Sequence, residues 1–155
     1  MKMNTVISGH IVLFDEEDLC LLSLYPWYVN NGVLTARAGK SILLFHRLIC
    51  PTRDVVDHIN GDRLDNRRAN LRACTQMENL RNRSIAKHNK SGYKGIYKTV
   101  LRNGGSRWRA EIGCNRRKIS LGTFETPQKA AEAYDSAAKK YHGEFARTNK
   151  ALGLV

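Results

Sequence analysis

The chain has no apolar run long enough to cross a membrane, so nothing predicts a membrane-spanning protein. An early apolar stretch, residues 6–14, is broken by Ser8-Gly9-His10 and runs directly into Asp15-Glu16-Glu17-Asp18. This pattern does not fit a signal peptide, which needs a longer uninterrupted apolar region. No strongly amphipathic basic helix stands out either, which makes membrane binding the weaker option. We therefore expect a cytoplasmic protein.

Paired cysteines are missing as well. The four cysteines, Cys20, Cys50, Cys74 and Cys114, are widely scattered and form no C-x-x-C pair. Without such pairs no zinc is expected, and buried, reduced thiols are the default. Zinc held by Cys50 or Cys74 together with a histidine is the alternative that the sequence leaves open.

Acidic residues are scarce, with 14 Asp and Glu against 26 Lys and Arg and a net charge of +12. Residues 1–55 hold five basic and five acidic residues, whereas residues 56–90 hold eight and four and residues 91–155 hold thirteen and five. The positive charge is therefore concentrated after residue 55, where a polyanion is the natural partner.

The first 55 residues predict a small antiparallel scaffold. The turn Asn30-Asn31-Gly32 between two apolar runs is a strong hairpin signal. An acidic first turn after residue 14 favours a short helix, because negative charge stabilises a helix N-terminus. The expected elements are strands at 10–14, 27–29, 33–38 and 42–45 and a helix at 15–25.

The centre of the sequence is the stretch 56–79. Asp57 and His58 end a short apolar run just before the turn-forming pair Asn60-Gly61. Thr75 and Glu78 have the spacing of a capping box, which predicts a helix from residue 76 to about residue 83. The order is therefore strand, loop, strand, helix, with Asn70 at the returning strand and Asn79 one turn into the helix.

These residue types suit phosphodiester hydrolysis. A neutral imidazole can take a proton from water at cellular pH, and His58 is the candidate base. The carboxylate of Asp57 and the amide oxygen of Asn79 are hard ligands suited to Mg²⁺, with Mn²⁺ as the alternative. The alternative is a purely structural role, in which the Asp and Asn residues form turns and His58 is a packed, hydrogen-bonded histidine.

The spacing of Asp57-His58, Asn70 and Asn79 resembles the His-Asn-His (HNH) nucleases of the ββα-metal fold, in a His-Asn-Asn variant. The surrounding residues look like the branch found in phage and intron-associated homing endonucleases. The resemblance implies that Asn70 orients the His58 ring through a hydrogen bond. The resemblance also implies that His46, in the motif His46-Arg47-Leu48-Ile49, supports the site or contacts a phosphate. The alternative is that His46 is a packed histidine near the core.

The C-terminal part predicts three strands, at 93–100, 107–114 and 117–124, followed by a helix from Pro127 to about His142. Thr126 is its expected N-cap and Gly143 its stop signal. Small and aromatic residues recur along the helix at spacings of three and four and should pack on the sheet. These are Ala130, Ala133, Tyr134, Ala137, Ala138 and Tyr141.

Strand parity then decides which sheet face is free. Trp108, Ala110 and Ile112, with Ile119 and Leu121, should face the helix, which leaves a basic outer face that fits a DNA major groove. The segments 108–112, 121–124 and 130–138 resemble the plant apetala and ethylene-response-factor DNA-binding domain. The resemblance implies that this sheet face enters the major groove. The expected DNA contacts are Lys94, Tyr97, Thr99, Arg107, Arg109, Glu111, Arg116, Lys118 and Ser120 here, and Arg81, Arg83, Lys87 and Lys90 before the sheet.

The predicted fold class is α+β: a small antiparallel scaffold with a ββα-metal nuclease, then a three-stranded antiparallel sheet packed on one helix. The predicted domains are an HNH nuclease domain at 1–83, a basic linker at 84–92 and a DNA-binding domain at 93–155.

The predicted function is a site-selective, metal-dependent endonuclease on double-stranded DNA in a phage-infected or bacterial host cell. It would act as a monomer or homodimer, and no protein partner is evident. Two alternatives stay open: a DNA-binding regulator with an inactive nuclease remnant, and a structural nucleic-acid module that prefers RNA.

Overall fold

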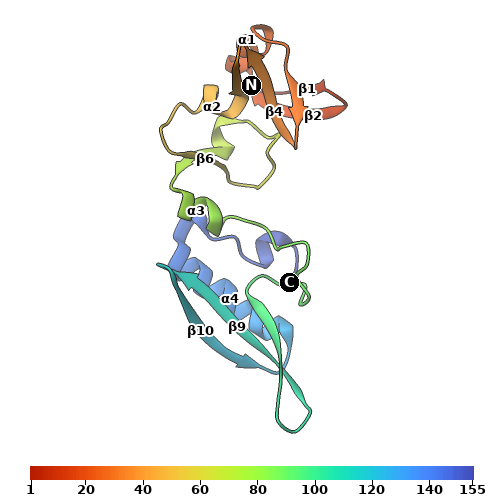
Figure 1. The fold of residues 1–155 in the computed structure, drawn as a ribbon, viewed down its shortest axis with the longest axis vertical. Coiled ribbons are helices and arrows are strands. Elements are labelled where there is room, and N and C mark those ends of the chain that lie inside the picture. The colour runs from red at the N-terminus through yellow and green to blue at the C-terminus, as the bar shows by residue number, and fades with distance from the viewer. The chain divides into compact units, whose positions relative to one another are not determined.

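The computed structural model describes residues 1–155, and the chain divides into two compact units, Met1–Asn79 and Leu80–Val155 (Figure 1). The fold is α+β, as predicted, with small antiparallel sheets and few helices. None of the helices is both long enough and apolar enough to cross a membrane.

The first unit contains three small antiparallel sheets. They consist of β1 (Lys2–Ile7) with β2 (His10–Asp15), of β4 (Val33–Ala38) between β3 (Tyr28–Asn30) and β5 (Ser41–Leu44), and of β6 (Val55–His58) with β7 (Leu71–Cys74). Its helical segments are η1 (Glu16–Asp18), α1 (Leu19–Ser23), α2 (Phe45–Ile49), η2 (Arg68–Asn70) and the start of α3 (Gln76–Arg81).

The strands at 10–14 and 33–38 and the start of a helix at residue 76 are confirmed, but two elements were not predicted. Strand β1 pairs with β2 through a tight turn at Ser8 and Gly9, which have φ angles of 52° and 76°. The polar break in the apolar run is therefore a hairpin turn. Phe45, expected to end a strand, instead begins helix α2, so His46 lies on a helix.

An apolar cluster holds the first unit together. Its buried members come from β2, β4, α2, β6 and β7, so the β6–β7 hairpin is packed against the N-terminal strands. The Trp27 ring meets Phe45 edge to face at a centroid distance of 5.1 Å. The buried residues of the cluster are Val12, Phe14, Leu34, Phe45, Ile49, Val56 and Leu71.

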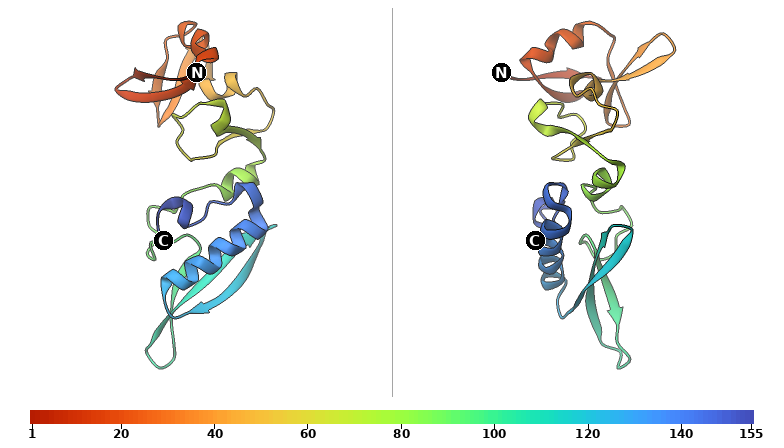
Figure 2. Two further views of the ribbon diagram at one scale, coloured as in Figure 1. Left: turned by 180° about the vertical axis from the view of Figure 1, so that it is seen from behind. Right: turned by 90° about the vertical axis from the view of Figure 1, so that its left-hand side faces the viewer.

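The second unit is a three-stranded sheet in the order β10-β9-β8 with α4 along one face (Figure 2). Its elements are β8 (Ile96–Val100), β9 (Ser106–Cys114), β10 (Arg117–Phe124), α4 (Pro127–His142), η3 (Gly143–Phe145) and η4 (Lys150–Leu152). Thr126 caps α4, since its hydroxyl accepts a hydrogen bond from the Lys129 amide at 3.3 Å, and Gly143 ends the helix with a φ of 55°. Both helix ends agree with the prediction.

The core of the second unit lies between α4 and the sheet. Ala110 and Ile112 are buried against the helix, and Trp108, Ile119 and Leu121 are partly buried there, as strand parity predicted. Ala131 is also fully buried, although the helical spacing did not place it on the packed face. The Tyr134 ring lies so close to the backbone at Gly95 that a Cβ added there would be 2.2 Å from one of its ring carbons.

The cysteines differ partly from expectation. All four are free thiols, but Cys20 is exposed and only Cys74 is fully buried. Cys20 lies in the short helix α1, which has no buried residue, so its side chain remains at the surface.

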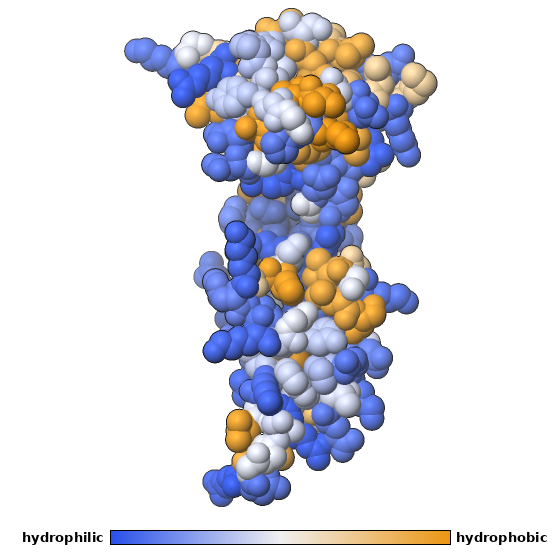
Figure 3. Space-filling view, turned by 90° about the vertical axis from the view of Figure 1, so that its right-hand side faces the viewer, coloured by the Kyte–Doolittle hydropathy of each residue, from blue (hydrophilic) through white to orange (hydrophobic).

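Figure 3 shows hydrophilic residues over most of one face of the molecule, with hydrophobic residues gathered in patches.

Candidate active site and nucleic-acid interface

The candidate active site is built on β6, β7 and α3. The two strands pair antiparallel, with Asp57 opposite Arg72 and His58 opposite Leu71. The capping box forms as predicted: the Thr75 amide donates to the Glu78 carboxylate at 2.8 Å, and the Glu78 amide donates to the Thr75 hydroxyl at 3.3 Å. Thr75 is the single residue between β7 and α3, and the backbone amide of Asn79 donates to its carbonyl at 3.0 Å.

His58 is the last residue of β6 and is buried. Its Nε2 lies 3.4 Å from Oδ1 of Asn66, a fully buried residue of the loop between the strands. The Asn66 amide nitrogen donates to the Leu64 carbonyl at 3.2 Å, which points the amide oxygen at the imidazole. Because an amide oxygen can only accept a hydrogen bond, this contact assigns the hydrogen of the neutral ring to Nε2 and leaves the basic lone pair on Nδ1.

The pKa of His58 is lowered, first because burial disfavours the charged ring. The hydrogen bond to Asn66 and the negative charge of Asp57 oppose this effect without cancelling it. His58 is therefore neutral at cellular pH, which is the state that a general base requires.

His46 lies beside this ring. The two imidazole centroids are 5.2 Å apart and the planes meet at 77°, an edge-to-face arrangement. The His46 side chain is buried and its Nδ1 has no hydrogen-bond partner. Burial, the neighbouring imidazole of His58 and the positive charges of Arg47 and Arg63 lower the pKa of His46 to about 4. Both predicted histidines thus meet in one place, and Arg63, which sequence reasoning missed, adds a positive charge close to both.

Asp57 is buried and paired with Arg72 across the hairpin. Nε and Nη2 of Arg72 donate to the same carboxylate oxygen, Oδ2, at 2.9 and 2.8 Å. Arg72 was not predicted as a site residue, although its position opposite Asp57 follows from the hairpin register. The buried carboxylate is therefore held in place by the guanidinium group of Arg72.

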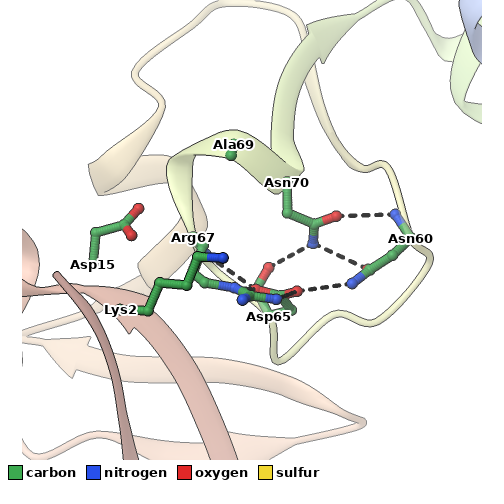
Figure 4. Close-up of a pocket in the computed structure, with 7 residues that line it drawn as sticks. All are labelled: Lys2, Asp15, Asn60, Asp65, Arg67, Ala69 and Asn70. Atoms are coloured by element: carbon green, nitrogen blue, oxygen red, sulfur yellow. Dashed lines mark hydrogen bonds and ion pairs between the residues drawn. The ribbon is translucent and has the colours of Figure 1, made fainter.

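Asn70 does not orient the His58 ring. Its amide oxygen accepts from the Asn60 backbone amide at 2.9 Å, and its amide nitrogen donates to the Asn60 side chain at 3.0 Å and to the Asp65 carbonyl at 2.8 Å (Figure 4). The His58 ring therefore donates to Asn66 in place of the predicted partner, and Asn70 instead stabilises the loop that follows His58.

The same loop is fixed from two further directions. Asp65 is buried, and Nε and Nη2 of Arg67 donate to its two oxygens at 2.7 and 2.5 Å, which holds the pKa of the carboxyl below its usual value. The Leu13 amide donates to the Leu64 carbonyl at 2.9 Å, and the Asn66 amide donates to the Leu13 carbonyl at 2.8 Å. Strand β2 therefore determines where Asn66 lies, and through Asn66 the orientation of His58. A pocket of about 250 Å³ opens beside this loop, as Figure 4 shows, and is lined by Lys2, Asp15, Asn60, Asp65, Arg67, Ala69 and Asn70.

The donor atoms available for a cation are oxygens. The chain has no cluster of three or more His, Cys, Asp or Glu side chains that could hold a metal ion by itself. Asp57 supplies one buried carboxylate, and Asn79, half-buried on α3, supplies an amide. A hard cation such as Mg²⁺ takes few protein ligands and completes its shell with water and phosphate oxygens, so the oxygen donors of these two residues suit it chemically.

The outer face of the second unit's sheet carries the residues that parity placed there. Tyr97 and Thr123 flank Arg109 in register, Thr99 lies opposite Arg107, and Ser120 lies opposite Glu111. Thr123 was missed because a bulge between Ser120 and Gly122 shifts the parity of β10.

Two arginines on this face are held by carboxylates. Arg109 pairs with Glu111 at 2.9 Å, and Arg107 pairs with Glu125 at 2.9 Å. Lys118 is exposed on β10, and Arg116 is exposed in the tight turn before it, with a φ of 63°. The predicted outer-face residues therefore gather on one basic surface, with the exception of Lys94.

Lys94 is not part of this outer face. Its Nζ donates to the carbonyls of Arg81 and Arg83, both at 2.7 Å, and burial lowers its pKa to about 8. The ammonium group is used to fix the backbone after α3, so Lys94 is removed from the DNA-contact set. The side chains of Arg83, Lys87 and Lys90 are exposed and that of Arg81 is half-buried.

These observations define a protein that joins a ββα nuclease motif to a sheet-and-helix module with a basic outer face. Residues 44–81 match the family model described as HNH endonuclease, and the C-terminal part matches AP2-like plant factors. The chain thus carries an HNH domain followed by an AP2-like DNA-binding domain, and the match supports a nuclease.

Individual relatives support both assignments. The "Uncharacterized HNH endonuclease L560" of Acanthamoeba polyphaga mimivirus is 28% identical over 138 residues, which cover 84% of this chain and 70% of the viral protein. The "Ethylene-responsive transcription factor ERF069" of Arabidopsis thaliana is 36% identical over 100 residues, 61% of this chain and 58% of that protein. The "AP2-like ethylene-responsive transcription factor AIL7" of the same plant is 47% identical over 57 residues, 35% of this chain and 11% of that protein. The chain therefore spans less than two thirds of these plant relatives.

Proposed function

We propose that the protein is a metal-dependent, site-selective DNA endonuclease of the homing-endonuclease type. It hydrolyses a phosphodiester bond at the HNH site, and the AP2-like domain grips the DNA. The observation that carries the proposal is the buried, neutral imidazole of His58, held by Asn66 at the end of β6 within the segment that matches the HNH family.

His58 acts as the general base. Its Nδ1 takes a proton from a water molecule as the water oxygen forms a bond to phosphorus and the bond to the leaving oxygen breaks. Asp57 and Asn79 would hold one Mg²⁺, or Mn²⁺ in its place. When bound, the cation neutralises the crowded phosphate oxygens and stabilises the leaving oxygen. His46 supports the base, since its ring packs edge to face on the His58 ring.

The AP2-like domain supplies affinity and site choice. Its outer face presents Arg107, Arg109 and Lys118 to a major groove, where arginine and lysine reach guanine edges or phosphates. Polar neighbours complete the surface and make further contacts. These are Tyr97, Thr99, Glu111, Arg116 and Ser120.

The segment after α3 binds the phosphate backbone. Arg81, Arg83, Lys87 and Lys90 each contribute about one slope unit to the salt dependence of binding if each neutralises one phosphate. Replacing all four by glutamine should therefore flatten that dependence. An unchanged slope identifies the segment as a spacer.

Each chain holds one site and makes one nick, so a double-strand break requires a homodimer or a second visit. The enzyme acts on double-stranded DNA in a phage-infected or bacterial host cell.

A plasmid assay tests the proposal. Supercoiled plasmid is incubated with Mg²⁺ and the wild type, with His58→Ala, or with the control His10→Ala, which removes an exposed histidine of the same unit. We expect relaxation by the wild type and the control, and none by His58→Ala with DNA affinity unchanged. DNA binding by the wild type without relaxation in Mg²⁺ or Mn²⁺ would instead identify a regulator with an inactive nuclease remnant. Tighter binding of RNA than of duplex DNA at equal salt would identify an RNA-binding module.

A further inference from the structure

The proposed metal ligand Asp57 already has a positively charged partner. Asp57 and Arg72 are direct neighbours in the register of β6 and β7, and Nε and Nη2 of Arg72 both donate to the same carboxylate oxygen. The exposed fractions of the two side chains are 5% for Asp57 and 13% for Arg72, so the pair is largely removed from water.

A buried carboxylate requires a compensating positive charge, because an unpaired charge in a dry environment is strongly unfavourable. In the protein without a cation, Arg72 supplies that charge. A divalent cation on Asp57 would supply the same charge, and the two positive groups would then repel each other at short range. Arg72 and the cation therefore compete for one carboxylate.

We propose that Arg72 is an internal counter-ion that holds Asp57 in place of the cation and is released when DNA arrives. A phosphate group offers the planar guanidinium a second partner with matching geometry, so the backbone of the substrate can take Arg72 over from Asp57. Cation binding is then weak in the free protein and is strengthened by DNA. This inference rests on the proposed function, since it requires Asp57 to be a metal ligand.

The arrangement couples two binding events. DNA and the cation each bind more tightly in the presence of the other, because each favours the state in which the Asp57–Arg72 pair is open. The free protein then holds little of the cation that cleavage needs, which limits hydrolysis to bound substrate.

Mn²⁺ binding tests the proposal directly, with free Mn²⁺ measured by electron paramagnetic resonance. The variants are Arg72→Met, which removes the competing charge, and Arg72→Lys, which keeps it. The matched control is Arg68→Met, because Arg68 pairs at 2.6 Å with Asp18, another buried carboxylate of the same unit. We expect Arg72→Met to bind Mn²⁺ at least about fivefold more tightly than the wild type without DNA, and Arg68→Met and Arg72→Lys to bind as the wild type does.

DNA supplies the second measurement. In a His58→Ala background, which prevents cleavage, duplex DNA should tighten Mn²⁺ binding in the chain with Arg72 and should have little effect in Arg72→Met. If Arg72→Met binds Mn²⁺ no more tightly than the wild type, the counter-ion role is refuted. If Asp57→Asn binds Mn²⁺ as well as the wild type, the metal site of the proposed function fails instead.

Loss of Arg72 leaves a buried carboxylate unpaired, so Arg72→Met can lower the melting temperature. The Mn²⁺-induced rise in melting temperature gives a readout that allows for this, since a ligand that binds the native state stabilises it. We expect a larger rise in Arg72→Met than in the wild type. An equal or smaller rise refutes the proposal even where the variant is less stable.

Discussion

Gly95 allows a prediction whose size can be worked out from the structure. Its φ is +75°, and an added Cβ would lie 2.2 and 2.3 Å from two ring carbons of Tyr134 and 2.7 Å from the Glu111 carbonyl oxygen. Tyr134 is buried in the core between α4 and the sheet, and the Glu111 amide donates to the Gly95 carbonyl at 2.9 Å. Neither neighbour can move away without disturbing the packing of the second unit.

Gly95→Ala combines two costs. The left-handed backbone costs a residue with a side chain about 1–2 kcal/mol, and overpacking of a dense core costs about 1–3 kcal/mol. The free energy of unfolding of the second unit should therefore fall by about 2–5 kcal/mol, which lowers the melting temperature of a unit of this size by about 10 °C or more.

A second glycine isolates the steric part of this effect. Gly104 has a φ of +80°, and an added Cβ would meet nothing within 4 Å. Gly104→Ala should therefore show the backbone cost alone. The chain has two tryptophans, so in a Trp27→Phe background the fluorescence of Trp108 follows the melting of the second unit. If Gly95→Ala and Gly104→Ala melt within about 2 °C of each other, the close contact with Tyr134 is not what requires glycine.

Three further outcomes are expected. The pKa of His46 falls from 6.5 to about 4 in the folded chain, so the unfolded state binds more protons between these pH values. The free energy of unfolding should therefore fall by up to about 3 kcal/mol as the pH is lowered from 6.5 to 4. Urea unfolding at several pH values should show a smaller fall for His46→Phe. Thr75→Ala removes the cap of α3 and should lower the free energy of unfolding of the first unit by about 1 kcal/mol, whereas Thr75→Ser should keep it, as urea titration followed by circular dichroism would show. Lys94→Met loses two hydrogen bonds to backbone carbonyls and should destabilise the second unit by about 1–3 kcal/mol. The salt dependence of DNA binding should not change. A weaker salt dependence would show that Lys94 contacts DNA after all.

The elements that local signals specify were predicted well. Helix α4 begins and ends where Thr126, Pro127 and Gly143 indicated, because capping depends on neighbouring residues alone. The same holds for the start of α3 at the capping box. Strand β1 was missed because its evidence is its pairing with β2, and pairing is not a local property.

The site shows the same division. Asn66 and Asn70 have the same side chain and lie in one loop, so their local preferences are alike. The backbone hydrogen bonds between Leu13 and the loop, which join residues far apart in the sequence, help to place Asn66 against His58 while Asn70 faces the loop itself. The pairing of Asp57 with Arg72 likewise depends on the register of β6 and β7. Twelve residues, 59–70, separate the two strands, and a loop of this length does not fix the register by its local sequence.

The contact between β2 and the loop after β6 limits how the catalytic part can be separated from the rest of the chain. The segment 44–81 that matches the nuclease family does not include Leu13, yet Leu13 holds the backbone on both sides of Asp65. An excised fragment of those residues would keep the imidazole and lose the strand that positions its hydrogen-bond partner. Transfer of the nuclease to another DNA-binding domain should therefore succeed only when the N-terminal hairpin is transferred with it.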